Sequence, residues 1–166
     1  MKWEDVRMEI KDKGGINQTA KKVLFFIQRA DGQQENYGPY ENLFLNSGMD
    51  WLAMYQSTTP GSAMNHMAVG TRSTAATLTD VVGSMGEVAR ATMATRIASD
   101  NILYEVATFG GFASNIASVS LREVVVANNA TSGPTGASRS RTVFASIVLA
   151  NSDLLRIEYQ TTCGSR

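Results

Sequence analysis

The residues that could perform chemistry in this 166-residue chain are few. A hydrolytic triad needs a nucleophile, a histidine base and an acid that orients the base. The only histidine, His66, has neighbours that form no catalytic signature. The segment Val82-Gly83-Ser84-Met85-Gly86 lacks the first glycine of a nucleophile elbow, because Val82 stands at that position. We therefore predict that the chain is not an enzyme and that His66 is packed or at the surface.

The sequence also lacks the ligand clusters of metal and nucleotide sites. Zinc requires three or four His, Cys or carboxylate ligands in clusters, and the chain has one histidine and one cysteine, Cys163. A calcium loop of alternating Asp and Asn, a phosphate-binding loop and a dinucleotide glycine pattern are all missing from the sequence. We expect no metal and no cofactor. Because Cys163 is alone, a disulfide within the chain is excluded.

Three arginines are candidates for contacts with other subunits. Arg90 and Arg96 lie six residues apart in a predicted single strand, Glu87 to Ala98, so their side chains would point to the same face. Together with Arg72 in the preceding loop, they could bridge to the carboxylates of a neighbouring subunit. The alternative is that all three are solvated side chains.

Trp3 is a further contact candidate, at the start of a predicted N-terminal arm, residues 1–40. Apolar and charged residues alternate from Val6 to Ile10, as in a half-buried strand. A terminal strand that pairs incompletely in its own chain can add to the sheet edge of a neighbour. We predict an arm at 1–40, packed in cis or exchanged with a neighbour, and a β-sandwich domain at 41–166.

The composition favours a folded protein that contacts other proteins. Hydrophobic residues make up 43% and charged residues 18% of the chain, against about 25% charged in an ordinary domain. Ser, Thr, Asn and Gly take the place of charge, and they are cheaper to bury in a contact. The alternative is that β-sandwiches simply use more Thr and Ser.

The charge pattern and the N-terminus exclude other partners. Net charge is zero, and without a basic stripe we expect no nucleic-acid partner. The N-terminus is charged and lacks the apolar region of a signal peptide. No apolar stretch approaches the ~18 residues that span a bilayer, so we expect no membrane partner and synthesis in a cytoplasm.

The elements that position these residues are predicted to be strands. The apolar run Lys22–Gln28 indicates a strand buried on both sides. Gln33–Tyr40 is polar and predicts an irregular loop, and Asn46–Tyr55 predicts the only helix, capped by Asn46 or Ser47. The predicted strands and loops that follow are a strand ending at Gly70, a loop at Thr71–Asp80, strands at Glu87–Ala98, Asn101–Phe109 and Ile116–Val126, a long loop at Asn128–Ala137, and a closing hairpin of Thr142–Leu149 with Leu154–Thr161.

Short strands at regular spacing predict a mainly β fold, an antiparallel β-sandwich of about eight strands with one short helix. Between about Asn42 and Thr162, the order and spacing of several motifs resemble the bacteriophage tail-collar and tail-fibre attachment domain family. The motifs are Asn46-Ser47-Gly48, Ala68-Val69-Gly70-Thr71, Glu87-Val88-Ala89-Arg90, Glu123, and Arg141 to Phe144. Arg141 joins the contact candidates through this resemblance.

The resemblance has departures, and they shape the functional hypothesis. Arg72 stands where a glycine is usual, Val125-Val126 replaces Gly-Leu, and no fibre shaft follows before Arg166. The resemblance implies a phage virion structural protein that binds copies of itself and other virion subunits, as a tail or collar adaptor or fibre-base component. The alternatives are a capsid decoration protein and a module that recognises a host-surface ligand through the Asn128–Ala137 loop.

Overall fold

The computed structural model describes residues 18–41, 43–44, 64–82, 85–99, 102–112, 118–130 and 137–163. Within these ranges the chain forms strands joined by turns and loops, and no α-helix. The predicted strand at Val6–Ile10 and the predicted helix at Asn46–Tyr55 lie outside the described residues. The predicted mainly β, antiparallel sandwich is confirmed, with ten strands where the sequence indicated about eight.

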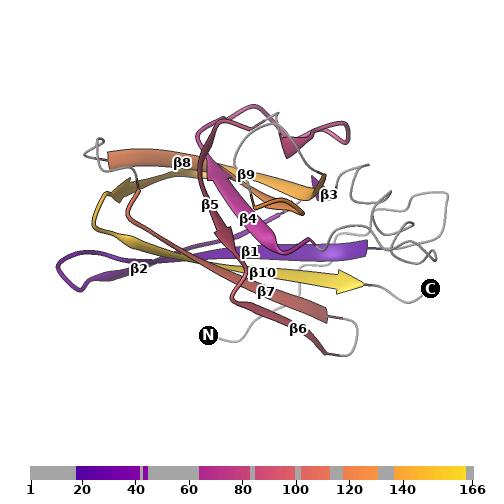
Figure 1. The fold of residues 1–166 in the computed structure, drawn as a ribbon, viewed down its shortest axis with the longest axis horizontal. Helices are drawn as coiled ribbons and strands as arrows, with labels where there is room; N and C mark the ends of the chain where they lie inside the picture. Colours follow the sequence, from indigo (N-terminus) through magenta and orange to yellow (C-terminus); the bar gives the residue numbers. More distant parts are fainter. Residues whose placement is uncertain are drawn as a thin grey trace.

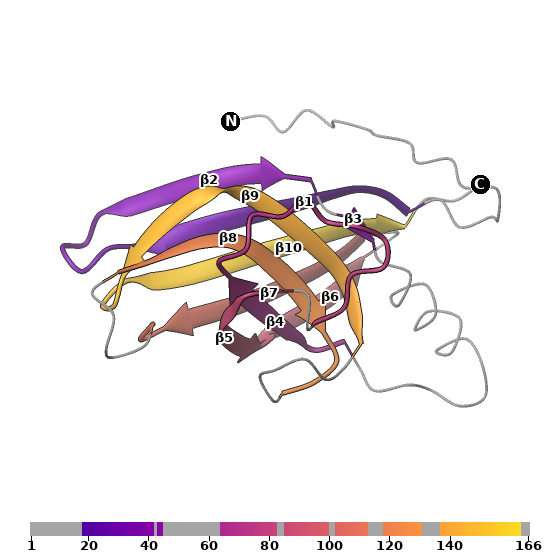
Figure 2. The same ribbon diagram turned by 90° about the horizontal axis from the view of Figure 1, so that it is seen from above.

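Two antiparallel sheets pack face to face (Figure 1). Sheet A has the order β2-β1-β10-β7-β6 and consists of β1 (Gln18–Gln28), β2 (Gln34–Tyr40), β6 (Thr95–Ser99), β7 (Ile102–Gly110) and β10 (Leu154–Cys163). Sheet B has the order β3-β9-β8-β4-β5 and consists of β3 (Leu43–Phe44), β4 (His66–Gly70), β5 (Glu87–Thr92), β8 (Ser118–Ala127) and β9 (Ser138–Ala150). Seen from above, β9 curves across the strands of sheet A (Figure 2).

The main core fills the space between the sheets. Side chains on a strand alternate between its faces, so about every second residue of a strand points into the space between the sheets. Phe25 of β1 and Phe144 of β9 meet across the sheets with ring centroids 4.4 Å apart, and Tyr40 lies 5.4 Å from Phe144. Burying each of these aromatic rings removes a large apolar surface from water, which is the main force that holds the sheets together.

The N-terminal half of sheet A differs from prediction at two segments. The run Lys22–Gln28 is not buried on both sides, because Val23, Phe25 and Ile27 are buried while Leu24 and Phe26 are only half-buried on the outer face. Gln33–Tyr40, predicted as an irregular loop, is a strand, β2. The loop prediction was wrong because a polar edge strand carries no apolar run, and pairing with β1 supplies its order instead.

The predicted arm contributes its described part to the sandwich. β1 lies between β2 and β10 in sheet A, and it pairs with β10 from Gln18 to Gln28. A tight turn joins β1 to β2, and Gly32 adopts the positive φ of 86° that this turn requires. Residues 18–40 are therefore packed in cis in this structure, and residues 1–17 lie outside the described part.

Two pairs of segments that the sequence joined belong to different sheets. Glu87–Ala98 was predicted as one strand, but the chain leaves sheet B after Thr92 and enters sheet A at Thr95. The closing segments were predicted as a hairpin, but β9 lies in sheet B and β10 in sheet A. The spacing predicts that Glu87–Ala98 and Asn101–Phe109 form a hairpin, and the structure confirms only its second part, β6 with β7. Sequence spacing predicts strands, whereas the choice of partner depends on contacts distant in the sequence.

Candidate interaction surfaces

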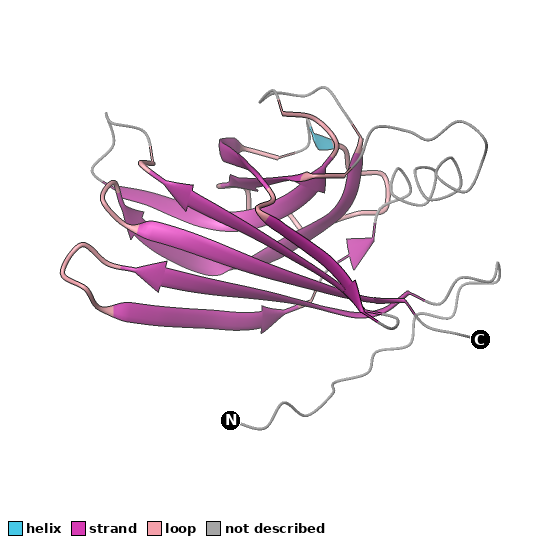
Figure 3. Ribbon diagram, turned by 60° about the horizontal axis from the view of Figure 1, so that its bottom comes forward, coloured by secondary structure: helices cyan, strands magenta, loops and turns pink. Residues whose placement is uncertain are grey.

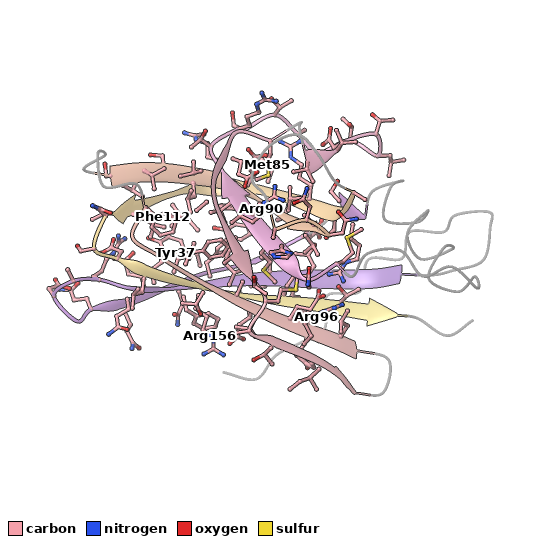
Figure 4. The ribbon with its side chains drawn as sticks, viewed as in Figure 1. Tyr37, Met85, Arg90, Arg96, Phe112 and Arg156 are labelled. Atoms are coloured by element: carbon pink, nitrogen blue, oxygen red, sulfur yellow. The ribbon has the colours of Figure 1, made fainter. Side chains whose placement is uncertain are left out.

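The outer face of sheet B is covered by the chain itself over Ala68, Val125 and Ala127, while Val148 of β9 stays 49% exposed beyond the covered part. The covering loop, defined as residues 71–82 with Met85 and Gly86, joins β4 to β5 above the upper layer (Figure 1). Val82 and Met85 of this loop pack on Ala68, Val125 and Ala127 of sheet B in a second, small apolar cluster. Met85 lies at the top of the molecule in Figure 4. The covering loop therefore forms a further layer of the fold, packed on the outside of sheet B.

A buried ion-pair network fastens the covering loop to the sheet. Arg141 of β9 has a side chain only 2% exposed, and its Nη2 lies 2.8 Å from Glu123 Oε2. Arg141 Nη1 donates to Asp80 Oδ2 of the loop at 2.6 Å, and Nη2 donates to the carbonyl of Thr74 at 3.2 Å. Burial raises the pKa of the Asp80 carboxyl, but hydrogen bonds from Thr77 and Arg141 outweigh it and hold the pKa below its usual value. The charge on Asp80 is thus favoured in the folded protein.

Glu123 is the centre of this network and is fully buried. Its Oε1 accepts hydrogen bonds from the backbone N–H groups of Gly86 at 2.8 Å and Arg72 at 2.9 Å. Gly70 faces it from the adjacent strand, and a Cβ at Gly70 would lie 2.6 Å from Glu123 Oε1 and 2.7 Å from the Gly86 carbonyl oxygen. Only glycine leaves room for the loop to approach this closely.

Arg90 is also used within the chain. Its side chain is 3% exposed; Nε and Nη2 donate to the Glu87 carboxylate at 2.9 and 2.7 Å, and Nη1 donates to the Asn129 carbonyl at 2.7 Å. His66, on the same strand pair, is buried, and its Nδ1 has no hydrogen-bond partner within the part of the chain that the structure describes. Burial, followed by the positive charge of Arg90, lowers the pKa of His66. The neutral imidazole packs as an ordinary buried side chain.

A second network of charges joins the two sheets inside the core. Glu105 of β7 is fully buried and accepts from both Nη atoms of Arg139, from β9. Arg139 is brought inward at an irregular point of the β8–β9 ladder, between Val126 and Ala127. Arg96 Nε lies 3.3 Å from the same carboxylate, and the Arg139 guanidinium lies over the Tyr159 ring. Glu105 therefore has partners from both sheets and is structural.

The structure separates the five predicted contact residues. Trp3 lies outside the described residues. Arg90 and Arg141 are withdrawn as subunit contacts, because both guanidinium groups are buried and bound within the chain. Arg96 is 32% exposed and faces Glu105, so it shares neither a strand nor a face with Arg90 (Figure 4). Arg72 is exposed on the covering loop and stays a predicted contact.

The outer face of sheet A has the opposite character, and Figure 3 brings it toward the viewer. We call it the open face. Near the β6 edge it carries Ile97, 56% exposed, directly opposite Tyr104, 42% exposed. Toward the other end Leu154 is 46% exposed, and Phe26 and Arg156 are cross-strand neighbours. Large apolar side chains exposed on adjacent strands are typical of a surface that contacts another molecule.

A groove of about 310 Å³ lies at the end of the open face away from Ile97 and Tyr104. Strands β1, β2, β10 and, through Thr108, β7 supply its wall, with Phe26, Asn36 and Arg156 among the other lining residues. The Arg156 guanidinium lies 5.9 Å from the Phe26 ring centroid and pairs with Glu158 at 2.6 Å. The sequence does not reveal this groove, because the polar residues of Gln33–Tyr40 are typical of a loop. The alternation of Gln34 and Asn36 with Glu35 and Tyr37 was the signal that could have revealed it.

The last predicted binding element is the Asn128–Ala137 loop. The Asn128–Ala137 loop is closed at its base by Ala137 N–H donating to Asn128 Oδ1 at 2.9 Å, and residues 131–136 lie outside the described part. In the described ranges there is no group of three potential metal ligands, and no helix long and apolar enough to cross a membrane. Comparisons with protein-family models, curated proteins and solved structures find no match.

Proposed function

We propose that this chain is a non-enzymatic structural protein of a bacteriophage particle, which assembles with copies of itself and with other virion subunits. The observation that carries the assembly role is the pair Ile97 and Tyr104, exposed side by side on the open face. The phage setting rests on the resemblance of the motif order to the tail-collar and tail-fibre attachment family. We place the protein at the tail, as a collar adaptor or fibre-base component, with capsid decoration as the alternative.

The position of β6 supports assembly through this end of the open face. β6 ends the strand order of sheet A, so one side of its backbone has no strand partner among the described residues. An edge strand with an exposed apolar side chain can pair with or pack against another chain. Ile97 and Tyr104 give such a contact apolar area, and the next β6–β7 pairs on the same face, Thr95 with Val106 and Ser99 with Ile102, carry no charge. The contact would thus form by burial of apolar surface.

Sedimentation of the purified protein tests the assembly contact. We expect the wild type to form oligomers, and Ile97→Lys to shift the population to monomer, because a lysine charge at an edge disfavours pairing. Leu78→Lys is the matched control, since Leu78 is 53% exposed on the covering loop and not on the open face. An Ile97→Lys protein that oligomerises as the wild type does would contradict this contact.

Quantitative mass spectrometry of purified phage particles tests the virion role. A low copy number, about six to a few dozen, is expected for the cyclic symmetry of a tail. Hundreds of copies would follow from icosahedral placement and would establish the decoration alternative. Absence of the protein from particles would overturn the proposed function.

A further inference from the structure

The groove on the open face is an unassigned binding site with a definite chemistry. It lies where β1 is flanked by β2 and β10, and Gln28 of β1 is directly opposite Gln34 and Leu154. Two residues along β1 from Gln28, Phe26 is directly opposite Asn36 and Arg156. Its volume of about 310 Å³ falls at the lower end of the range for small-molecule sites.

The polar groups of the groove both donate and accept hydrogen bonds. Each side-chain amide of Gln28, Gln34 and Asn36 offers an N–H₂ donor pair and a carbonyl acceptor. None of these three amides has a hydrogen-bond partner in the described part of the chain, and all three residues are exposed. A hydroxyl is likewise both a donor and an acceptor, so a row of amides matches a ligand that carries several hydroxyls.

The apolar part of the groove complements the faces of a sugar ring. Phe26 is half-buried between the polar residues, with the Arg156 guanidinium over its ring at 5.9 Å from the centroid, and Leu154 is 46% exposed beside them. The C–H faces of a sugar ring are apolar, while its rim carries hydroxyls. The apolar side chains and the three amides of the groove can therefore contact one sugar ring at the same time. Ligand sites combine apolar area with a few directed polar groups in this manner.

Charge and topology argue against other classes of occupant. The single cation of the groove, Arg156, is paired with Glu158 at 2.6 Å, so an anionic ligand would have to compete with the Glu158 carboxylate for the guanidinium. A peptide that adds as a strand would pair at the outer edge of β2, which has no strand partner among the described residues, and not over the groove, because β1 and β10 beneath it are each paired on both sides. An uncharged, polyhydroxylated ligand satisfies both constraints.

We propose that this groove binds a neutral oligosaccharide, with Gln34 and Asn36 as hydrogen-bonding residues and Phe26 and Leu154 as the apolar floor. This site is separate from the Asn128–Ala137 loop and from the assembly contact at Ile97. A virion protein with such a groove would attach to a neutral glycan surface, but the binding itself does not depend on the virion role.

Isothermal titration with hexasaccharides of glucose, galactose, mannose and N-acetylglucosamine tests the proposal, with hexagalacturonate as the acidic counterpart. We expect at least one neutral hexasaccharide to bind with a Kd below about 1 mM. Gln34→Ala with Asn36→Ala should weaken that binding by about tenfold or more, the loss of two hydrogen bonds. Gln160→Ala is the matched control, an amide on the same face outside the groove, and it should bind as the wild type does.

The outcomes decide between this site and the alternatives. No binding of any of the four neutral hexasaccharides at about 10 mM overturns the proposal, as does binding that the double substitution leaves unchanged. Stronger binding of hexagalacturonate than of every neutral hexasaccharide also overturns it. Unfolding midpoints of the variants confirm that they are folded. Retained binding in Ile97→Lys would keep the groove standing even if the assembly contact fails.

Discussion

The two outer faces of this sandwich were built in opposite ways. On sheet B the covering loop lies over the strands, and Arg141, Glu123 and Asp80 form a buried network between loop and sheet. On sheet A the open face leaves Ile97, Tyr104 and Leu154 exposed, and its Arg156–Glu158 ion pair is in solvent. On the covered part of sheet B the charges bind one another and the loop, whereas on the open face the large apolar side chains Ile97, Tyr104 and Leu154 remain exposed to solvent.

The charges buried inside this molecule are tolerated because they are paired. Removing one partner of a buried ion pair leaves the other unpaired at low dielectric, which is strongly destabilising. Each buried carboxylate here has more than one donor: Glu123 has Arg141 and two backbone N–H groups, and Glu105 has Arg139 and Arg96. All of these hydrogen bonds can therefore form together only when the covering loop and the two sheets are correctly aligned.

The largest expected effect comes from the centre of the covered face. We predict that Glu123→Ala lowers the free energy of unfolding by about 3–5 kcal/mol, because Arg141 keeps only Asp80 of its two carboxylate partners and two backbone N–H groups lose their acceptor. Urea unfolding followed by circular dichroism measures the change. Glu123→Gln keeps one acceptor and should cost less. A loss below about 1 kcal/mol in the alanine variant would mean that the network is not buried in solution.

The second-largest difference in stability is expected when one methyl group is added at a glycine of each sheet. Gly70→Ala places a Cβ against Glu123 and the Gly86 carbonyl oxygen, and we expect a loss of about 1–3 kcal/mol from this overpacking. Gly110→Ala is the matched control, because its Cβ would meet only the flexible end of the Leu154 side chain at 2.9 Å. Equal losses in the two variants, measured by urea unfolding, would contradict the close approach of the covering loop.

The pH dependence of stability should reveal His66. Its folded pKa is lowered by burial and by Arg90, so the unfolded chain binds the proton more readily. Stability is then complete above the unfolded value of about 6.5 and decreases as the pH falls below it toward the folded pKa. We expect the urea midpoint to decrease between pH 8 and pH 5.5 in the wild type, and to change less in His66→Asn. An equal decrease in both proteins would assign the effect to another group.

Carboxylates respond at lower pH, which keeps the two effects apart. Hydrogen bonds from Arg29 and then Tyr37 lower the pKa of Glu35 to about 2, at the end of the sandwich where Arg29 also binds Asp153. The stability that these contacts add is present above the ordinary carboxyl range and is lost as the pH falls through the folded pKa. It therefore does not contribute to the change between pH 8 and pH 5.5.

The smallest effect is expected on the open face. Glu158→Gln removes the Arg156 ion pair, whose side chains are 55% and 34% exposed, and should change the free energy of unfolding by about 0–1 kcal/mol. The same denaturation assay, repeated at about 1 M salt, should erase what difference there is. A loss comparable to that of Glu123→Ala would show that the open face is covered in solution.

Local patterns in the sequence were sufficient for the fold class but not for the site. Alternation and turn residues predicted β strands, the β6–β7 hairpin and the loop after Gly70. The same patterns placed Arg90 and Arg96 on one strand, because the sheet change at Met93 and Ala94 leaves no breaker residue. They also hid Asn36 in a predicted loop, since β2 is mostly polar and has only Tyr37 and Tyr40 as aromatic residues packed against the core.

The sequence by itself determined the strand-forming segments and their two-residue alternation, because these follow from backbone geometry and neighbouring side chains. Only the tertiary structure decided which strands share a sheet, which outer face is covered, and hence that Arg141 is buried while Arg156 is exposed. Those outcomes depend on pairings between residues far apart in the chain, such as Glu123 with Arg72. No local pattern encodes them, since the free energy of burial belongs to the assembled pair.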